Sequence, residues 1–257
     1  MTFRVRITQV IVLVVFVAIW EIITYYGIVS RFVLPSPSSV ATTFVKLFTP
    51  AGLKLIPGGI YPQLFTTLTE IAGAFSLAVA IGLPLGFAIG MKRTISDIYE
   101  PIIYLLYSIP GIVLYPVIYL LVGVGPPSKI IFGALIATWL LTINTIAGLR
   151  QIKPQYFRLA RSLRLSGLRT MFNVVIPAAA PNIIAGFRQG LALAIIGVVA
   201  GEILASNRGL GFVISSASYT FQLDVMYAVI LLVLIIGFSL TEVMRFIERR
   251  YLAHAVA

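Results

Sequence analysis

The sequence contains no cysteine and a single histidine, His254, close to its C-terminus. Without thiols, disulfide bonds, thiolate catalysis and cysteine-ligated zinc or iron–sulfur sites are excluded. One terminal histidine also leaves no imidazole in the body of the chain for general-base catalysis. We therefore expect no catalytic residue, no metal site and no enzyme activity on this chain.

Charged residues are scarce as well: they make up 11% of the 257 residues, whereas hydrophobic residues make up 60%. A soluble globular domain averages about 25% charged residues. So few polar side chains cannot cover a water-exposed surface of this size, and most side chains must face lipid or one another. The composition predicts an all-α integral membrane protein, with one transmembrane domain over residues 1–257.

Six apolar runs approach or exceed the ~20 residues that an α-helix needs to cross a bilayer. They lie at about 7–29, 65–91, 101–123, 130–149, 182–205 and 225–244. Pro110 and Pro116 interrupt the third run, which predicts a kinked or broken helix. The first run exceeds the apolar region of a signal peptide, about 7–15 residues, and we expect it to be retained as a span.

The basic residues indicate the orientation of these helices. With the N-terminus inside, fourteen of the nineteen lysines and arginines fall in inner segments. The five in outer segments are Arg31, Lys46, Lys54, Lys129 and Arg208. Because loops rich in lysine and arginine stay on the cytoplasmic side of the membrane, both termini of this multi-pass protein are expected there. The net charge of +11 is then explained by topology and contact with membrane lipid, without a nucleic acid partner.

Two outer segments have features of short surface helices. In the first, Ser36 can cap a helix and Pro37 suits its first position. The residues that would share its apolar face are Val40, Phe44 and Leu47. The second, residues 206–224, is expected to form a re-entrant segment or a short surface helix.

A long inner loop, at about 150–181, carries an unusual concentration of arginine. From residue 157 to 165, helical spacing separates two sets of side chains, Leu159, Ala160 and Leu163 from Arg158, Arg161 and Arg164. A turn at Ser166 and Gly167 and a second short helix follow. Two interpretations remain open: the loop lies on lipid headgroups, or its apolar face docks into a groove on a partner.

Polar residues inside the apolar runs are candidates for a translocation pathway, because a charge at mid-bilayer costs about 2.5–3.5 kcal/mol. Glu202, near the outer end of the fifth run, is the main candidate. Glu21 and Glu70 are interpreted as interfacial anchors. The remaining candidates, which either face an aqueous channel or form interhelical hydrogen bonds, are Ser108, Asn144 and Thr145.

No GxxxxGK[ST] phosphate loop is present, so ATP hydrolysis by that route would need another chain. The absence of a visible internal repeat disfavours secondary transporters built from inverted repeats. A self-sufficient secondary transporter or channel nevertheless remains the alternative to an ATP-driven system.

The inner loop resembles a motif of ABC-importer permease subunits, E-A-A-x(3)-G-x(9)-I-x-L-P. The chain reads RLARSLR at 158–164 and VVIP at 174–177. Ala160 and Pro177 match the motif, and the spacing from Arg164 to Pro177 is the same. The other segments that resemble the sulfonate, taurine and nitrate branch are LPSPSSV, TLTEIAGAFSLAVAIGLPLG, SIPGIVLYP, NTIAGLR and GEILASNRGLGFVI.

The resemblance implies a six-span permease of a bacterial or archaeal inner membrane, with a coupling-helix loop between helices four and five. It implies alternating access, a second permease copy as homodimer partner, two ATP-binding subunits and an extracytoplasmic solute-binding protein. ATP and Mg²⁺ would bind the ATPase, with no cofactor on this chain. The residues implied in ATPase coupling are Arg158, Leu159, Ala160, Ser162, Leu163, Arg164, Gly167 and Pro177.

Two positions depart from the family motif. Arg158 stands where the motif has glutamate, and Arg164 stands where it has glycine. We expect Gly167, three residues later, to provide the turn for which the motif uses its glycine. The charge reversal at Arg158 suggests the hypothesis that the groove of the partner ATPase is more acidic than usual.

Overall fold

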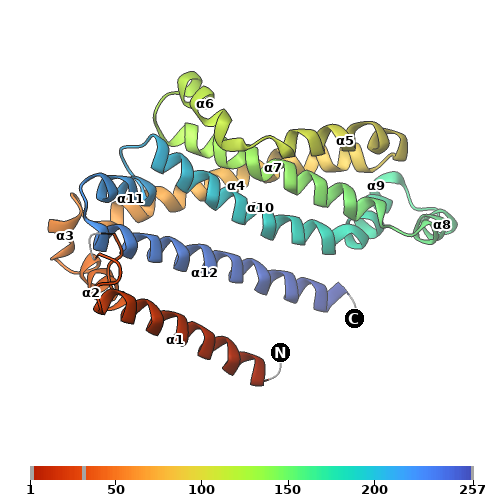
Figure 1. Cartoon of the computed structure of the whole chain (residues 1–257). Helices are drawn as coiled ribbons and strands as arrows, with labels where there is room; N and C mark the ends of the chain where they lie inside the picture. Colours follow the sequence, from red (N-terminus) through yellow and green to blue (C-terminus); the bar gives the residue numbers. More distant parts are fainter. Residues whose placement is uncertain (1–2, 31–32, 256–257) are drawn as a thin grey trace.

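The computed structural model describes residues 3–30 and 33–255, and within these residues it is helical, without a strand (Figure 1). Arg31, one of the outer basic residues, lies outside the described part. Five helices are long and apolar enough to cross a membrane. They are α1 (Phe3–Tyr25), α4 (Ile60–Gly90), α7 (Pro126–Arg150), α10 (Ile176–Leu204) and α12 (Leu223–Ala255).

A bent pair of helices, α5 (Arg93–Ser108) and α6 (Tyr115–Val122), is long and apolar enough to count as a sixth span if the two are taken together. The two are bent by 78° around Pro110 and a 3₁₀ turn, η1 (Gly111–Leu114). The helix through the third apolar run is thus broken, as its prolines predicted. Helix α5 begins before the expected residue 101, because its first two turns carry charged side chains and escape a search for apolar runs.

The centre of the bundle is the packing of α4 and α10 on either side of α7. Small side chains allow this close approach, with Ala74, Ala137 and Ala194 fully or almost fully buried. Gly86 of α4 lies so close to α7 that an added Cβ would overlap the side chain of Thr145. Glycine is therefore required at this crossing by space and not by backbone conformation.

Short helices lie at both ends of the bundle in Figure 1. One end, called the outer end below, carries α2 (Pro37–Leu47), α3 (Gly52–Leu55) and α11 (Leu210–Tyr219). The inner end carries α8 (Pro154–Ser162) and α9 (Gly167–Thr170). The start of α1 and the end of α12 point toward the inner end.

Helix α2 has the predicted amphipathic character. The Ser36 hydroxyl accepts the N–H of Ser39 at 3.3 Å, and Pro37 occupies the first turn. Val40 and Leu47 are buried against the outer part of α12 and against α11. The cap and the apolar face therefore hold α2 across the outer end.

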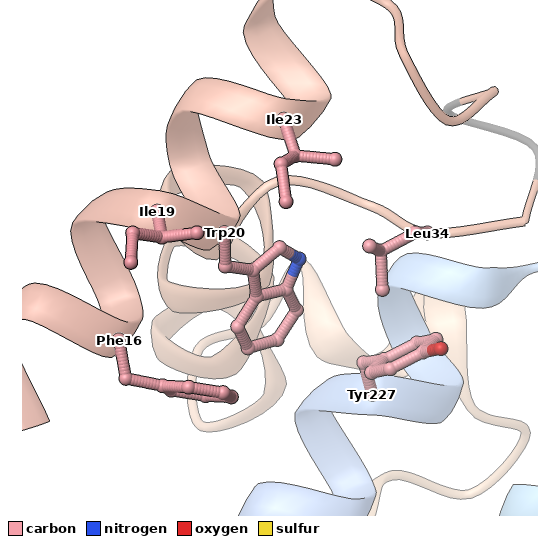
Figure 2. A pocket seen from close by; sticks show the side chains of 6 residues that line it. All are labelled: Phe16, Ile19, Trp20, Ile23, Leu34 and Tyr227. Atoms are coloured by element: carbon pink, nitrogen blue, oxygen red, sulfur yellow. The ribbon is translucent and has the colours of Figure 1, made fainter.

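Helix α1 is attached to the rest of the chain at its outer end. Trp20 donates its indole N–H to the carbonyl of Pro35 at 3.1 Å, and Glu21 accepts from the backbone N–H and the hydroxyl of Ser38 at 3.0 and 2.8 Å. Beside this attachment lies an open apolar groove of about 400 Å³ between α1 and α12 (Figure 2). Its lining residues are Phe16, Ile19, Trp20, Ile23, Leu34 and Tyr227.

Candidate functional site

The inner loop presents an uncovered apolar surface on α8. Tyr156, Leu159 and Leu163 follow one another at helical spacing and are 43%, 56% and 63% exposed. Ala160 turns the other way and is buried at 3%, and Phe157 of the same helix packs on the buried cluster that contains Val175 and Ala179. The predicted face is therefore divided: its alanine fixes α8 to the bundle, and its leucines remain free for contact.

Apolar exposure continues beyond α8. Leu168 of α9 and Phe172 in the following turn are 76% and 65% exposed. Arg158 is exposed on α8, whereas the Ser162 hydroxyl donates to the carbonyl of Leu159 at 2.8 Å. Exposed apolar residues on a loop between spans have the character of a docking surface.

The turn after α8 is made by Arg164, and the prediction that Gly167 provides it is wrong. Arg164 has φ +50°, while Gly167 begins α9 in ordinary helical conformation. The N–H of Arg164 bonds to the carbonyl of Arg161, and that of Leu165 bonds to the carbonyl of Ala160, both at 3.0 Å. These bonds form a Schellman motif, which places the left-handed residue directly after the helix end.

Pro177 lies in the first turn of α10, after five residues of π-helix, Met171–Val175. A proline ring clashes with the carbonyl four residues earlier, which here belongs to Asn173. The wider π turn accommodates that clash and allows the chain to pass from α9 into α10 without a break. The inner loop is therefore joined directly to the long apolar helix α10.

The four pathway candidates are not brought together. Ser108 lines a groove of about 360 Å³ between the broken third span, α7 and α10. Asn144 donates from its amide to Gln189 of α10 at 3.2 Å, and Thr145 is buried with its hydroxyl on the carbonyl of Leu141. Asn144 thus forms an interhelical hydrogen bond, the second of the two interpretations considered for it.

Glu202 is fully buried and is the centre of a polar cluster at the outer end. Its carboxylate accepts from the Thr67 hydroxyl at 2.7 Å and from the N–H of Gly211 at 2.8 Å. The Thr67 oxygen accepts the N–H of Leu210, and Gln63 accepts that of Gly209, both at 2.8 Å. Side chains of α4 and α10 therefore satisfy three successive N–H groups at the start of α11.

Sequence reasoning missed the role of this cluster, although RGLG soon after Glu202 is a signal for it. Gly209 has φ +100°, and an added Cβ there would overlap the Glu202 carboxylate. Glycine at this position therefore permits both the left-handed turn and the close approach of the acid.

A second buried charge site joins α4 to α7. Glu70 and Lys129 are each 1% exposed, with 3.8 Å between the lysine nitrogen and a carboxylate oxygen. The interpretation of Glu70 as an interfacial anchor is wrong, and Lys129 is not an exposed loop charge. Both lie near the ends of apolar runs, where a sequence pattern does not distinguish a residue at the interface from one that points inward.

Comparison with known proteins gives the family. Residues 78–253 match a model described as the binding-protein-dependent transport system inner membrane component. The chain belongs to this family. The taurine transport system permease protein TauC of Escherichia coli is 31% identical over 93% of this chain and 86% of its own length. The nitrate import permease protein NrtB of Synechocystis sp. is 33% identical over 74% of this chain and 69% of its own.

Solved structures show that the fold of this permease is shared as well. A chain of the MetNI methionine ABC transporter, from inward-facing crystal forms, superposes with a TM-score of 0.68. Its sequence identity is 19%, over 79% of this permease and 99% of that chain. The prediction of an ABC-importer permease of the sulfonate, taurine and nitrate type is confirmed.

The buried ion pair predicts a large effect of removing one charge. Lys129→Met leaves the Glu70 carboxylate buried without its counter-charge and should destabilise this permease by about 3–5 kcal/mol. Lys129→Met combined with Glu70→Gln should recover most of that loss. Thermal unfolding in detergent measures both, with exposed Lys46→Met as control. A double variant no more stable than Lys129→Met would contradict the pairing.

The turn after α8 predicts a stabilising substitution. Arg164→Gly removes the steric cost of φ +50° for a residue with a Cβ and should stabilise the end of α8 by about 1 kcal/mol. Slower amide hydrogen exchange at residues 164 and 165 would report it. Gly167→Ala is the matched control and should be neutral, because no atom lies within 4 Å of the added Cβ. Destabilisation by Gly167→Ala would contradict this assignment and indicate that Gly167 provides the turn.

Proposed function

We propose that this permease moves a small solute inward by alternating access, driven by a separate ATPase that docks on α8. The observation that carries the proposal is the uncovered apolar surface of α8, defined by Tyr156, Leu159 and Leu163, on a loop outside the spans. A groove on an ATP-binding subunit is the partner expected for such a helix. ATP and Mg²⁺ bind on that subunit, and this chain carries no cofactor.

The proposed assembly contains two copies of this permease, two ATP-binding subunits and an extracytoplasmic solute-binding protein. Both termini and α8 lie in the cytoplasm of a bacterial or archaeal cell, a placement supported by the distribution of basic residues. It is also supported by the direction of α1 and α12 in Figure 1. Closure of the ATPase dimer brings two α8 helices together and reopens the spans outward, so each state binds the ATPase with a different affinity.

The relatives support a small solute with a negatively charged oxygen-rich group, because TauC is named for taurine, which carries a sulfonate group, and NrtB for nitrate. The alternative, a secondary transporter or channel, needs an acid free to bind a coupling ion. In the described part of the chain, the fully buried acids are Glu70 and Glu202. Glu202 accepts hydrogen bonds from Thr67 and Gly211, whereas Glu70 accepts none and is balanced by Lys129 at 3.8 Å. The contacts therefore favour the ATP-driven proposal.

Docking through α8 is tested by placing charge in its apolar surface. Leu159→Asp should abolish co-purification of the ATP-binding subunit and solute-stimulated ATP hydrolysis. The free-energy cost of burying an unpaired carboxylate in the interface exceeds the gain from the apolar contact. The fold should be unaffected, since Leu159 is exposed. Arg161→Gln, on the other side of α8, is the matched control. Solute uptake by this chain alone in liposomes would refute the proposal.

The charge of the partner groove is a separate question, tested at Arg158. This residue is exposed, and its guanidinium has no carboxylate partner among the described residues. If the groove is acidic, Arg158→Glu should reduce complex assembly about tenfold or more, because like charges meet across the interface. Arg158→Gln should have a smaller effect. Unchanged assembly would reject the acidic groove but leave the docking of α8 intact.

A further inference from the structure

A polar hollow of about 520 Å³ opens at the outer end of the molecule. It lies between α3, the loop that precedes α11, α11 itself and the turn from α11 to α12. Lysine and arginine contribute to its wall, and no acid does. The polar and basic residues that matter here are Lys54, Arg208, Asn207, Ser216, Thr220 and Gln222.

The two cations of the hollow are available to a partner. Lys54 and Arg208 are exposed, and neither forms an ion pair within the part of the chain that the structure describes. The acids on α1 and α12 nearest this end are already engaged. Glu21 accepts from Ser38, and Asp224 accepts from the Ser39 hydroxyl at 2.5 Å. The wall of the hollow therefore carries two cations without an ion pair in the described residues and no acid, although the exposed Asp224 lies next to the lining residue Val225 in sequence.

Arg208 is held on a rigid loop. Its carbonyl accepts the Ser206 hydroxyl at 2.6 Å. The N–H groups of the next three residues are fixed by Gln63, Thr67 and Glu202, as described above. A charge on such a preorganised loop binds without the entropy cost of ordering the backbone.

Two aromatic residues flank the hollow at Thr220. Tyr219 and Phe221 are 83% and 80% exposed. Phe221 has φ +55°, and the N–H of Gln222 bonds to the carbonyl of Ala217 at 2.8 Å, the pattern of a Schellman motif. A bulky residue in this conformation is strained, and glycine would make the same turn without strain. The turn therefore presents an aromatic ring at a cost to its own stability.

We propose that this hollow and its two aromatic residues form a docking site for an acidic surface loop of the solute-binding protein. The proposal rests on the proposed function, because it needs the outer end to be extracytoplasmic. Positive charge matches an acidic partner, and exposed aromatic and arginine side chains are typical anchors of protein interfaces. Hydroxyl and amide groups around the cations suit the backbone and carboxylates of a polypeptide loop.

The test uses this permease with its ATP-binding subunits in nanodiscs, titrated with the solute-binding protein encoded next to it. Lys54→Glu combined with Arg208→Glu should raise the concentration for half-maximal ATPase stimulation about tenfold or more, because rim charges govern encounter. Maximal stimulation should be unchanged. Lys46→Glu, an exposed outer cation of α2 outside the hollow, is the matched control.

A second variant separates binding from stability. Phe221→Gly should raise the thermal unfolding temperature, because φ +55° is unstrained for glycine. The same substitution should lower the affinity of this permease for the solute-binding protein several-fold. A residue with only a structural role would not move these two quantities in opposite directions. Unchanged half-maximal concentrations in both variants would overturn the proposal.

Two further results have defined meanings. If the variant defect appears in phosphatidylglycerol nanodiscs but vanishes in phosphatidylcholine, lipid headgroups occupy the hollow and the proposal is overturned. If the wild-type complex assembles but no concentration of binding protein stimulates it, the proposed function fails together with the docking site. A raised half-maximal concentration in the variants, with normal stimulation of the wild type, supports both.

Discussion

The N–H groups at the start of a helix that is buried in the protein cannot reach water, so acceptors must come from the chain itself. At the outer end of this permease, Glu202 is one such acceptor for α11, with Thr67 and Gln63 as the others. The acid on α10 and the polar side chains on α4 thereby determine where α11 begins. Because α11 packs on α12 and borders the polar hollow, the shape of the outer surface depends on this buried contact.

The inner end is constrained by conformation more than by charge. Arg164 accepts a left-handed backbone so that α8 can end and the chain can turn back toward the membrane. Ala160 is small enough to lie against the bundle while Leu159, one position away, stays exposed. The combination fixes the orientation of α8 from one side and leaves its other side for a partner. The proposed mechanism uses this division, because force on the exposed side of α8 would reach the spans through the buried side.

Local chemistry made much of this structure predictable. Prolines around Gly111 indicated the broken span, and Ser36 with Pro37 indicated the start of α2, because both effects act within a few residues. The pairing of Glu70 with Lys129 joins positions far apart in sequence, and an apolar pattern does not tell which way a charge at a helix end points. The turn at Arg164 was assigned to the nearby glycine because composition identifies a favourable turn residue, whereas the helix end selects the position.

Helix α10 connects the two functional ends of the molecule. It runs unbroken for 29 residues, from the π turn that follows the coupling loop to Glu202 and the cap of α11. At ~1.5 Å per residue, it is about 43 Å long. In the proposed mechanism, α10 transmits a displacement of α8 by the ATPase to the position from which Glu202 holds α11. In this mechanism, the same helix also moves the loop that carries Arg208. Binding of the ATPase at the inner end and of the solute-binding protein at the outer end then shifts the same equilibrium between the two permease conformations.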